Sequence, residues 1–218
     1  MTAMTIERLT EILELADQLR AGRDKMQEPQ ELPAPFGNAI RAVDSVLQAM
    51  KCEAVLAGGW AVWRLGFAAR VTEDIDIVLP ADRIEEFLQF AAASGFERLP
   101  QPVGRWPKVR HTESGIKVDI LPEGARPGNS KEPAPTTIPH PKGMGGVPGR
   151  LRYIRLVALF ELKLAAGRAR DRHDVVELIR ANPNFLADIR QHLQTVHESY
   201  ASTFDYLVER AREEEEER

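Results

Sequence analysis

The stretch from Asp74 to Pro80 constrains the fold more than any other part of the sequence. Acidic and β-branched side chains alternate along it, in the order Asp74-Ile75-Asp76-Ile77. A period of two residues is typical of a β-strand, and Pro80 ends it because proline has no N–H to donate to a neighbouring strand. Both carboxylates therefore project from one face of the strand, and the isoleucines lie on the other.

Two carboxylates held this close repel each other, and each raises the pKa of the other unless a cation neutralises them. The pair suggests a divalent metal site or a general acid/base dyad. The plainer alternative is an exposed strand edge that is protected by its charge. Magnesium fits better than zinc, because it prefers oxygen ligands and no histidine or cysteine lies nearby in the sequence.

A second predicted strand brings a third acid into consideration. In the run from Ile116 to Leu121 every second residue is apolar and faces the core, which leaves Asp119 on the opposite side. If the two strands are neighbours, Asp119 joins Asp74 and Asp76 in a cluster of three carboxylates. Such a cluster would favour a metal or catalytic site over a strand edge that is merely protected by its charge.

Two other features fit a phosphate ligand. Gly58-Gly59 lies between a predicted strand and a helix, where backbone N–H groups can meet a phosphate, although such a pair is often only a tight turn. From Lys142 to Arg172 there are eight basic residues and two acidic ones. That segment is either a solvated helix face or a site for a polyanion.

The remaining patterns predict an α/β fold of the α+β type, with a small mixed sheet of about four or five strands. An antiparallel hairpin of 108–112 with 116–121 argues against a doubly wound parallel sheet. Residues 122–149 hold seven prolines and six glycines, so this segment is an active-site cover or a disordered linker. Apolar residues from Phe185 to Ala211 predict one long helix or two in register, packed on the protein's own core or in a dimer seam.

Helices are also predicted over 5–22, 36–50, 60–66, 82–94, 156–167 and 171–181, and a strand over 53–57. We expect three regions: N-terminal helices over 1–50, the sheet core over 51–155 and a C-terminal helical part over 156–218.

Composition narrows the class of protein. With 43% hydrophobic and 28% charged residues the chain is neither disordered nor fibrous. Its longest apolar run, Leu156 to Phe160, is far too short to span a bilayer, and a single cysteine, Cys52, excludes an internal disulfide. The net charge of −4 comes from the final residues, EEEEER, and the rest of the chain is neutral. The overall charge therefore does not indicate a class of binding partner. We expect a cytoplasmic protein without membrane contact.

The glycines and acids together resemble a known signature. Leu56-Ala-Gly58-Gly59-Trp60-Ala-Val through Arg70-Val-Thr72-Glu-Asp74-Ile-Asp76-Ile resembles the GG(W)A…R.T.D(I/L)D(I/L) pattern of the DNA polymerase β-like nucleotidyltransferase superfamily. Leu162-Lys163-Leu164, followed by Arg168 to Leu178, is similar to the helix pair of its minimal branch. That branch holds abortive-infection toxin (AbiEii-type) and aminoglycoside or lincosamide nucleotidyltransferases. Many members of the wider superfamily have Gly-Ser where this chain has Gly58-Gly59.

The resemblance implies an enzyme that transfers a nucleoside monophosphate from an NTP to a hydroxyl group with two Mg²⁺ ions. Asp74, Asp76 and Asp119 would be the catalytic and metal-binding acids. The residues implied at the nucleotide are Gly58, Gly59, Arg70, Thr72, Lys163 and Arg168. Asp171 and Asp174 have a plainer interpretation, in which they cap their helix or pair with Arg168 and Arg172.

The acceptor is the least determined part of this prediction. The basic segment and the toxin branch favour RNA, with a cognate antitoxin protein as partner. An aminoglycoside-type small molecule is the alternative acceptor, and a non-catalytic nucleotide-binding or RNA-binding module is the alternative function.

Overall fold

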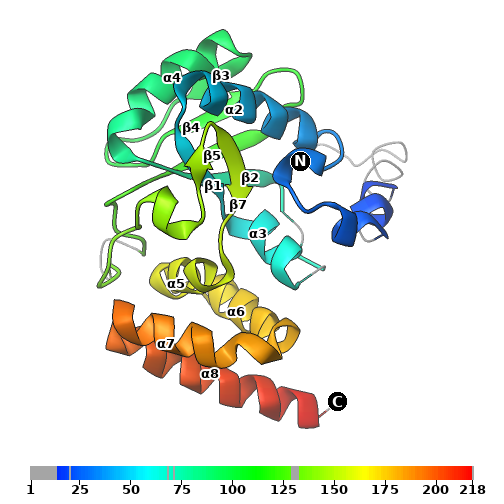
Figure 1. Ribbon diagram of the computed structural model, residues 1–218, viewed down its shortest axis with the longest axis vertical. Helices are drawn as coiled ribbons and strands as arrows, with labels where there is room; N and C mark the ends of the chain where they lie inside the picture. Colours follow the sequence, from blue (N-terminus) through cyan, green and yellow to red (C-terminus); the bar gives the residue numbers. More distant parts are fainter. Residues whose placement is uncertain (1–13, 20, 68, 71, 129–132, 218) are drawn as a thin grey trace.

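The computed structural model describes residues 14–19, 21–67, 69–70, 72–128 and 133–217. Figure 1 shows a sheet with helices α2 and α4 on one side, and a stack of helices α5 to α8 on the other, ending at the C-terminus. None of the helices among these residues is long and apolar enough to cross a membrane.

Within the described residues, seven strands form one mixed sheet in the order β3-β4-β5-β2-β1-β6-β7. Their bounds are β1 Glu53–Leu56, β2 Asp74–Leu79, β3 Phe96–Leu99, β4 Lys108–His111, β5 Lys117–Pro122, β6 Val147–Pro148 and β7 Arg150–Tyr153. β2 is parallel to β5 and antiparallel to β1, and β1 is also parallel to β7.

The mixed α+β sheet and the hairpin of β4 with β5 are confirmed, and the doubly wound alternative is wrong. The predicted number of four or five strands is also wrong. The strands that were not predicted are β3, β6 and β7, which contain four, two and four residues. Such short segments become strands only through hydrogen bonds from a neighbour.

The helices lie close to their predicted positions. Their bounds are α2 Phe36–Met50, α3 Gly58–Leu65, α4 Ile84–Ala93, α5 Leu156–Ala166, α6 Ala169–Ala181, α7 Leu186–Val196 and α8 Glu198–Glu216. Short 3₁₀ turns are η1 Arg23–Lys25, η2 Pro29–Glu31, η3 Ala81–Arg83, η4 Pro141–Met144 and η5 Pro183–Phe185. Of the helix predicted over 5–22, residues 14–19 and 21–22 are helical, and the rest lies outside the described residues.

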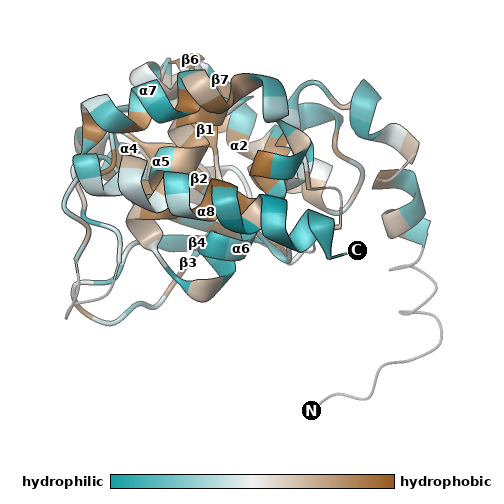
Figure 2. Ribbon diagram, turned by 90° about the horizontal axis from the view of Figure 1, so that it is seen from below, coloured by the Kyte–Doolittle hydropathy of each residue, from teal (hydrophilic) through white to brown (hydrophobic). Residues whose placement is uncertain are grey.

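The C-terminal apolar pattern forms two helices rather than one. The chain is extended at His197, whose ring accepts a hydrogen bond from the Ser199 N–H and so caps α8. The buried positions join the protein's own core, which confirms that interpretation over a dimer seam: Ile189, Leu193, Tyr200, Phe204, Leu207 and Ala211. The exposed end of α8 is hydrophilic in Figure 2.

Two hydrophobic clusters cover the two faces of the sheet. Ile75 and Ile77 of β2 pack in the cluster that contains α2 and α4, whereas Val78 packs in the cluster that contains α5 to α8. Side chains of a strand alternate between faces, so Asp74 and Asp76 project from the same face as Val78. The acids therefore lie on the side of the sheet that carries the C-terminal helices.

The described part of the proline- and glycine-rich segment is packed against this second cluster. Ala134, Ile138 and Met144 are buried in it, and Ile138 exchanges backbone hydrogen bonds with Gly124 and Ala125. Thr136 Oγ1 also lies 2.9 Å from the Tyr200 hydroxyl of α8. In its described residues the segment is thus an ordered covering, not a disordered linker.

Candidate active site

The three predicted acids lie on neighbouring parallel strands. Asp74 and Asp76 belong to β2 and Asp119 to β5, and Asp76 is directly opposite Asp119 in the register. Adjacent strands are separated by about 4.8 Å, so the side chains of opposite residues on one face are neighbours. The juxtaposition that the sequence predicted is therefore present.

The surroundings of Asp76 change the pKa of its carboxyl group. Burial, together with the negative charges of Asp74 and Asp119, raises its pKa to about 6 from the ordinary value of 3.8. The positive charges of Lys163 and Arg168 act in the opposite direction without cancelling the rise. Burial is the largest of these effects, and the two neighbouring carboxylates add to it.

The two glycines bring the start of α3 against these acids. Gly58 has a φ of +60°, and a Cβ atom there would lie 1.7 Å from Asp76 Oδ2. A Cβ on Gly59 would lie 2.7 Å from Thr72 Oγ1. Any side chain at Gly58 would overlap the carboxylate, so the packing itself requires glycine at this position.

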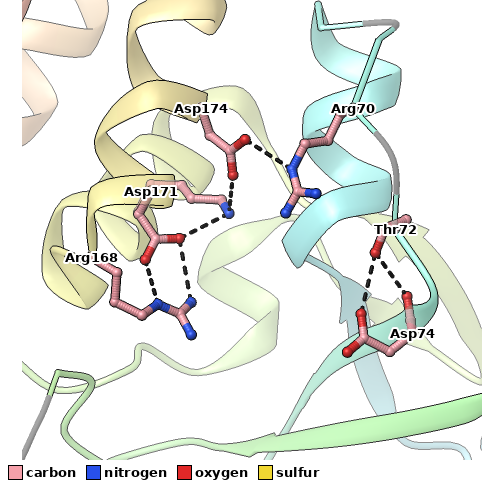
Figure 3. A network of polar contacts seen from close by, with 7 residues as sticks. Arg70, Thr72, Asp74, Arg168, Asp171 and Asp174 are labelled. Atoms are coloured by element: carbon pink, nitrogen blue, oxygen red, sulfur yellow. Dashed lines mark hydrogen bonds and ion pairs between the residues drawn. The ribbon is translucent and has the colours of Figure 1, made fainter. Parts of the chain in front are cut away.

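Thr72 orders the turn that leads into β2. Its hydroxyl lies 3.2 Å from Asp74 Oδ1 and 3.3 Å from the Asp74 carbonyl oxygen, and donates toward both (Figure 3). The hydroxyl thereby orients the first of the three acids, which agrees with an ordering role for Thr72.

Lys108 belongs to the site although the sequence pattern did not single it out. It lies opposite Asp119 in the pairing of β4 with β5, and its Nζ donates to Asp119 Oδ2 at 2.5 Å. The other oxygen, Asp119 Oδ1, is buried without a hydrogen-bond partner in the structure. The hairpin register would have identified Lys108, but a register cannot be read from the strand pattern alone.

Lys163 and Arg168, both predicted at the nucleotide, are held by acids of α6. Lys163 is 7% exposed, and its Nζ donates to Asp171 Oδ1 at 3.1 Å and to Asp174 Oδ2 at 2.7 Å. Arg168 Nε donates to Asp171 Oδ2 at 2.6 Å. Arg70 Nε forms an ion pair with Asp174 Oδ1 at 2.9 Å, so the network reaches the segment that precedes β2 (Figure 3).

The charges of this network compensate each other. Burial opposes ionisation of Asp171, but hydrogen bonds from Arg168 and the charge of Lys163 outweigh it and lower its pKa. Asp174 is fully buried and contacts both Lys163 and Arg70, not the predicted Arg172. The plainer interpretation, in which these acids pair structurally, therefore holds. Asp171 pairs with the predicted Arg168, whereas Lys163 and Arg70 are the partners found in place of Arg172.

The basic segment does not form one continuous face. Its members lie on η4, β7, α5 and α6, and Arg152 pairs with Glu28 at 3.2 Å while Lys163 and Arg168 pair with acids of α6. Arg150 and Arg155 remain exposed at the sheet end and at the start of α5. Part of the positive charge of this segment is thus neutralised by Glu28, Asp171 and Asp174.

The donor set of the acid cluster suits a hard divalent cation. Carboxylate oxygens are the ligands that Mg²⁺ prefers, and Asp119 Oδ1 is a buried oxygen that still needs a partner. In the part of the chain that the structure describes, no three side chains of Asp, Glu, His or Cys are already arranged as a ligand set. Asp74 is turned toward Thr72 and Asp119 toward Lys108, which accounts for the open arrangement.

Comparison with known proteins agrees with this geometry. Residues 39–137, just under half of the chain, match the family model described as aminoglycoside-2''-adenylyltransferase. The matched segment contains both glycines, the acids of β2 and Asp119. No curated protein matches the sequence.

Three solved structures illustrate the range of proteins that the chain is similar to. ANT(2'')-Ia in complex with adenylyl-2''-tobramycin is 17% identical, with 81% of this chain and 97% of that chain covered and a TM-score of 0.44. JHP933 from Helicobacter pylori is 14% identical, with coverages of 83% and 91% and a TM-score of 0.42. The Cid1 poly(U) polymerase is 14% identical, with coverages of 77% and 46% and a TM-score of 0.35. From the match over residues 39–137 and the arrangement of its acids and glycines, we conclude that the chain is a nucleotidyltransferase that resembles the aminoglycoside-2''-adenylyltransferase family.

Proposed function

We propose that this nucleotidyltransferase moves a nucleoside monophosphate from an NTP to a hydroxyl group of an amine-bearing sugar of the aminoglycoside class. The observation that carries the proposal is the position of Asp76, opposite Asp119 in the sheet and in contact with the start of α3 at Gly58. The aminoglycoside-2''-adenylyltransferase match over residues 39–137 supports the choice of acceptor.

In the proposed reaction the acceptor oxygen attacks the α-phosphorus. The bond from that phosphorus to the bridging oxygen of the β-phosphate breaks, and pyrophosphate leaves. Asp119 accepts the hydroxyl proton as the general base of the proposed step. Two Mg²⁺ ions held by Asp74, Asp76 and Asp119 would neutralise the triphosphate and activate the attacking oxygen.

The glycines and the basic residues have supporting roles in this proposal. The absence of side chains at Gly58 and Gly59 leaves the first turn of α3 open to the triphosphate, as at other helix N-termini that bind phosphate. Arg168 has a side chain that is 76% exposed, so it can reach a phosphate while Asp171 holds its Nε. Lys163 is buried between two acids, so we propose that it acts through its charge rather than by direct contact.

RNA is the competing acceptor, and the proposal can be tested against it directly. The protein would be incubated with labelled NTPs and Mg²⁺ and, in parallel, with an aminoglycoside panel, total RNA or total protein. We expect label on an aminoglycoside and none with Asp76→Asn. Label on RNA alone would contradict the proposed aminoglycoside acceptor and favour the predicted toxin with its antitoxin partner. NTP binding without transfer to any acceptor would favour the non-catalytic module.

A further inference from the structure

Lys108 is bound to one of the three acids by the geometry of the sheet. It lies opposite Asp119 in the pairing of β4 with β5, and both residues project from the same face. The Lys108 side chain is 36% exposed and that of Asp119 is 20% exposed, so the ion pair sits at the border of the site. The register, rather than a chance contact of a long surface side chain, brings the ammonium to Asp119 Oδ2.

The other cations near the acids are engaged elsewhere. Lys163 and Arg168 donate to Asp171 and Asp174, and they act on Asp76 only through their charge. Lys108, in contrast, donates directly to Asp119 Oδ2. A divalent cation bound by Asp119 would interact with the same carboxylate and could replace the ammonium there. An ammonium and a divalent cation close to the same carboxylate repel each other strongly in a partly buried site.

We propose that Lys108 competes with the divalent cation for Asp119 and so sets the affinity of the site for that cation. This inference rests on the proposed function, because it takes Asp119 as a metal-binding acid. One consequence is that the cation binds weakly by itself. It binds well when a triphosphate accompanies it, because the added negative charge offsets the ammonium and offers it a new partner.

The test measures binding of Mn²⁺ alone, by calorimetry and by electron paramagnetic resonance, to the full chain and three variants. Lys108→Met removes the ammonium and keeps most of the side-chain length. Arg110→Met is the matched control, because Arg110 lies two residues further along β4 on the same face and pairs with Glu97. The third variant combines Lys108→Met with Asp119→Asn, which removes the acid for which Lys108 competes.

We expect Lys108→Met to bind Mn²⁺ about tenfold more tightly than the unaltered chain, and Arg110→Met to bind it equally. The double variant with Asp119→Asn should lose the gain. Equal affinity of Lys108→Met and the unaltered chain, or weaker binding by the variant, would overturn the proposal. Failure of the proposed metal site is a separate result, in which neither the unaltered chain nor any variant binds Mn²⁺, and it would overturn both.

A second measurement requires no substitution. Acetylation of lysines by a small amine-reactive acyl donor, such as acetic anhydride, which releases acetate, is followed by mass spectrometry with and without saturating Mg²⁺. Release from Asp119 should increase the rate at Lys108 several-fold, while Lys51, an exposed residue at the end of α2, keeps its rate. An unchanged rate at Lys108 would contradict the displacement.

Discussion

Asp76 and Asp174 both lie between the sheet and the C-terminal helices, yet their surroundings differ in kind. Each oxygen of Asp174 has a cation within 2.9 Å, from Arg70 on one side and Lys163 on the other. Asp76 instead neighbours Asp74 and Asp119, and its pKa is raised to about 6. The helix pair neutralises its acids internally, whereas Asp76 lies among other acids on the central strands β2 and β5, where an external cation can neutralise them.

Aspartate therefore has a structural role in the helix pair and a proposed cation-binding role on β2 and β5. A buried acid with matched cations holds α5, α6 and the segment before β2 together, and removing one partner leaves an uncompensated charge. A partly buried acid among other acids has an unfavourable interaction that a bound cation would relieve. Substitutions in the two places should therefore affect different properties.

The largest effect should come from Asp76→Asn, which removes the middle acid of the cluster on β2 and β5. We expect the transfer rate to fall by about three powers of ten while the circular dichroism spectrum is unchanged. Asp82→Asn is the control, because Asp82 is an exposed acid just beyond the other end of β2. Retention of metal-dependent NTP consumption by Asp76→Asn would contradict the mechanism.

The next effect concerns the helix pair. Asp174→Asn leaves Lys163 and Arg70 with a neutral neighbour in a buried site, so the free energy of unfolding should fall by about 3 kcal/mol. Asp205→Asn, which breaks the more exposed pair with Arg190, should change it by about 0.5 kcal/mol or less. Urea unfolding of both variants measures the two values, and equal effects would remove the distinction between the regions.

Gly58→Ala tests the contact that positions Asp76. The added Cβ would overlap Asp76 Oδ2 and shift the carboxylate, so we expect about a hundredfold loss of transfer rate. Gly115→Ala provides a matched control, because Gly115 has a φ of +72° but no atom within 4 Å of an added Cβ. The control should lose about 1 kcal/mol of stability from backbone strain and no activity.

The smallest effect is a pH dependence of stability. The pKa of Asp76 is about 6 in the folded protein and near the ordinary 3.8 when unfolded, so its ionisation destabilises the fold above pH 6. This cost disappears as the pH falls from 6 toward 4. Relative to Asp76→Asn, the unaltered chain should therefore gain about 2 kcal/mol of stability over that interval. Parallel pH profiles from urea unfolding without divalent cation would contradict the assignment.

Local periodicity in the sequence was sufficient for most of the elements. The alternation at Asp74 to Ile77 predicted β2 and the common face of its two acids, and helical spacing predicted α2 with the bounds that the structure has. Both signals arise within a few consecutive residues, because side-chain direction repeats every two residues in a strand and every 3.6 in a helix. The short strands β3, β6 and β7 were missed, although β7 alternates basic and apolar residues over its four positions.

The sequence by itself determined which residue types the site contains: three acids on two strands, two glycines before α3, and a basic helix pair. Only the tertiary structure decided which charges compensate each other. Lys163, predicted at a phosphate, is neutralised by Asp171 and Asp174, and Lys108 reaches Asp119 from a third strand. Ion pairs depend on distances between segments that are far apart in the chain, and those distances follow from strand register and helix packing rather than from any local pattern.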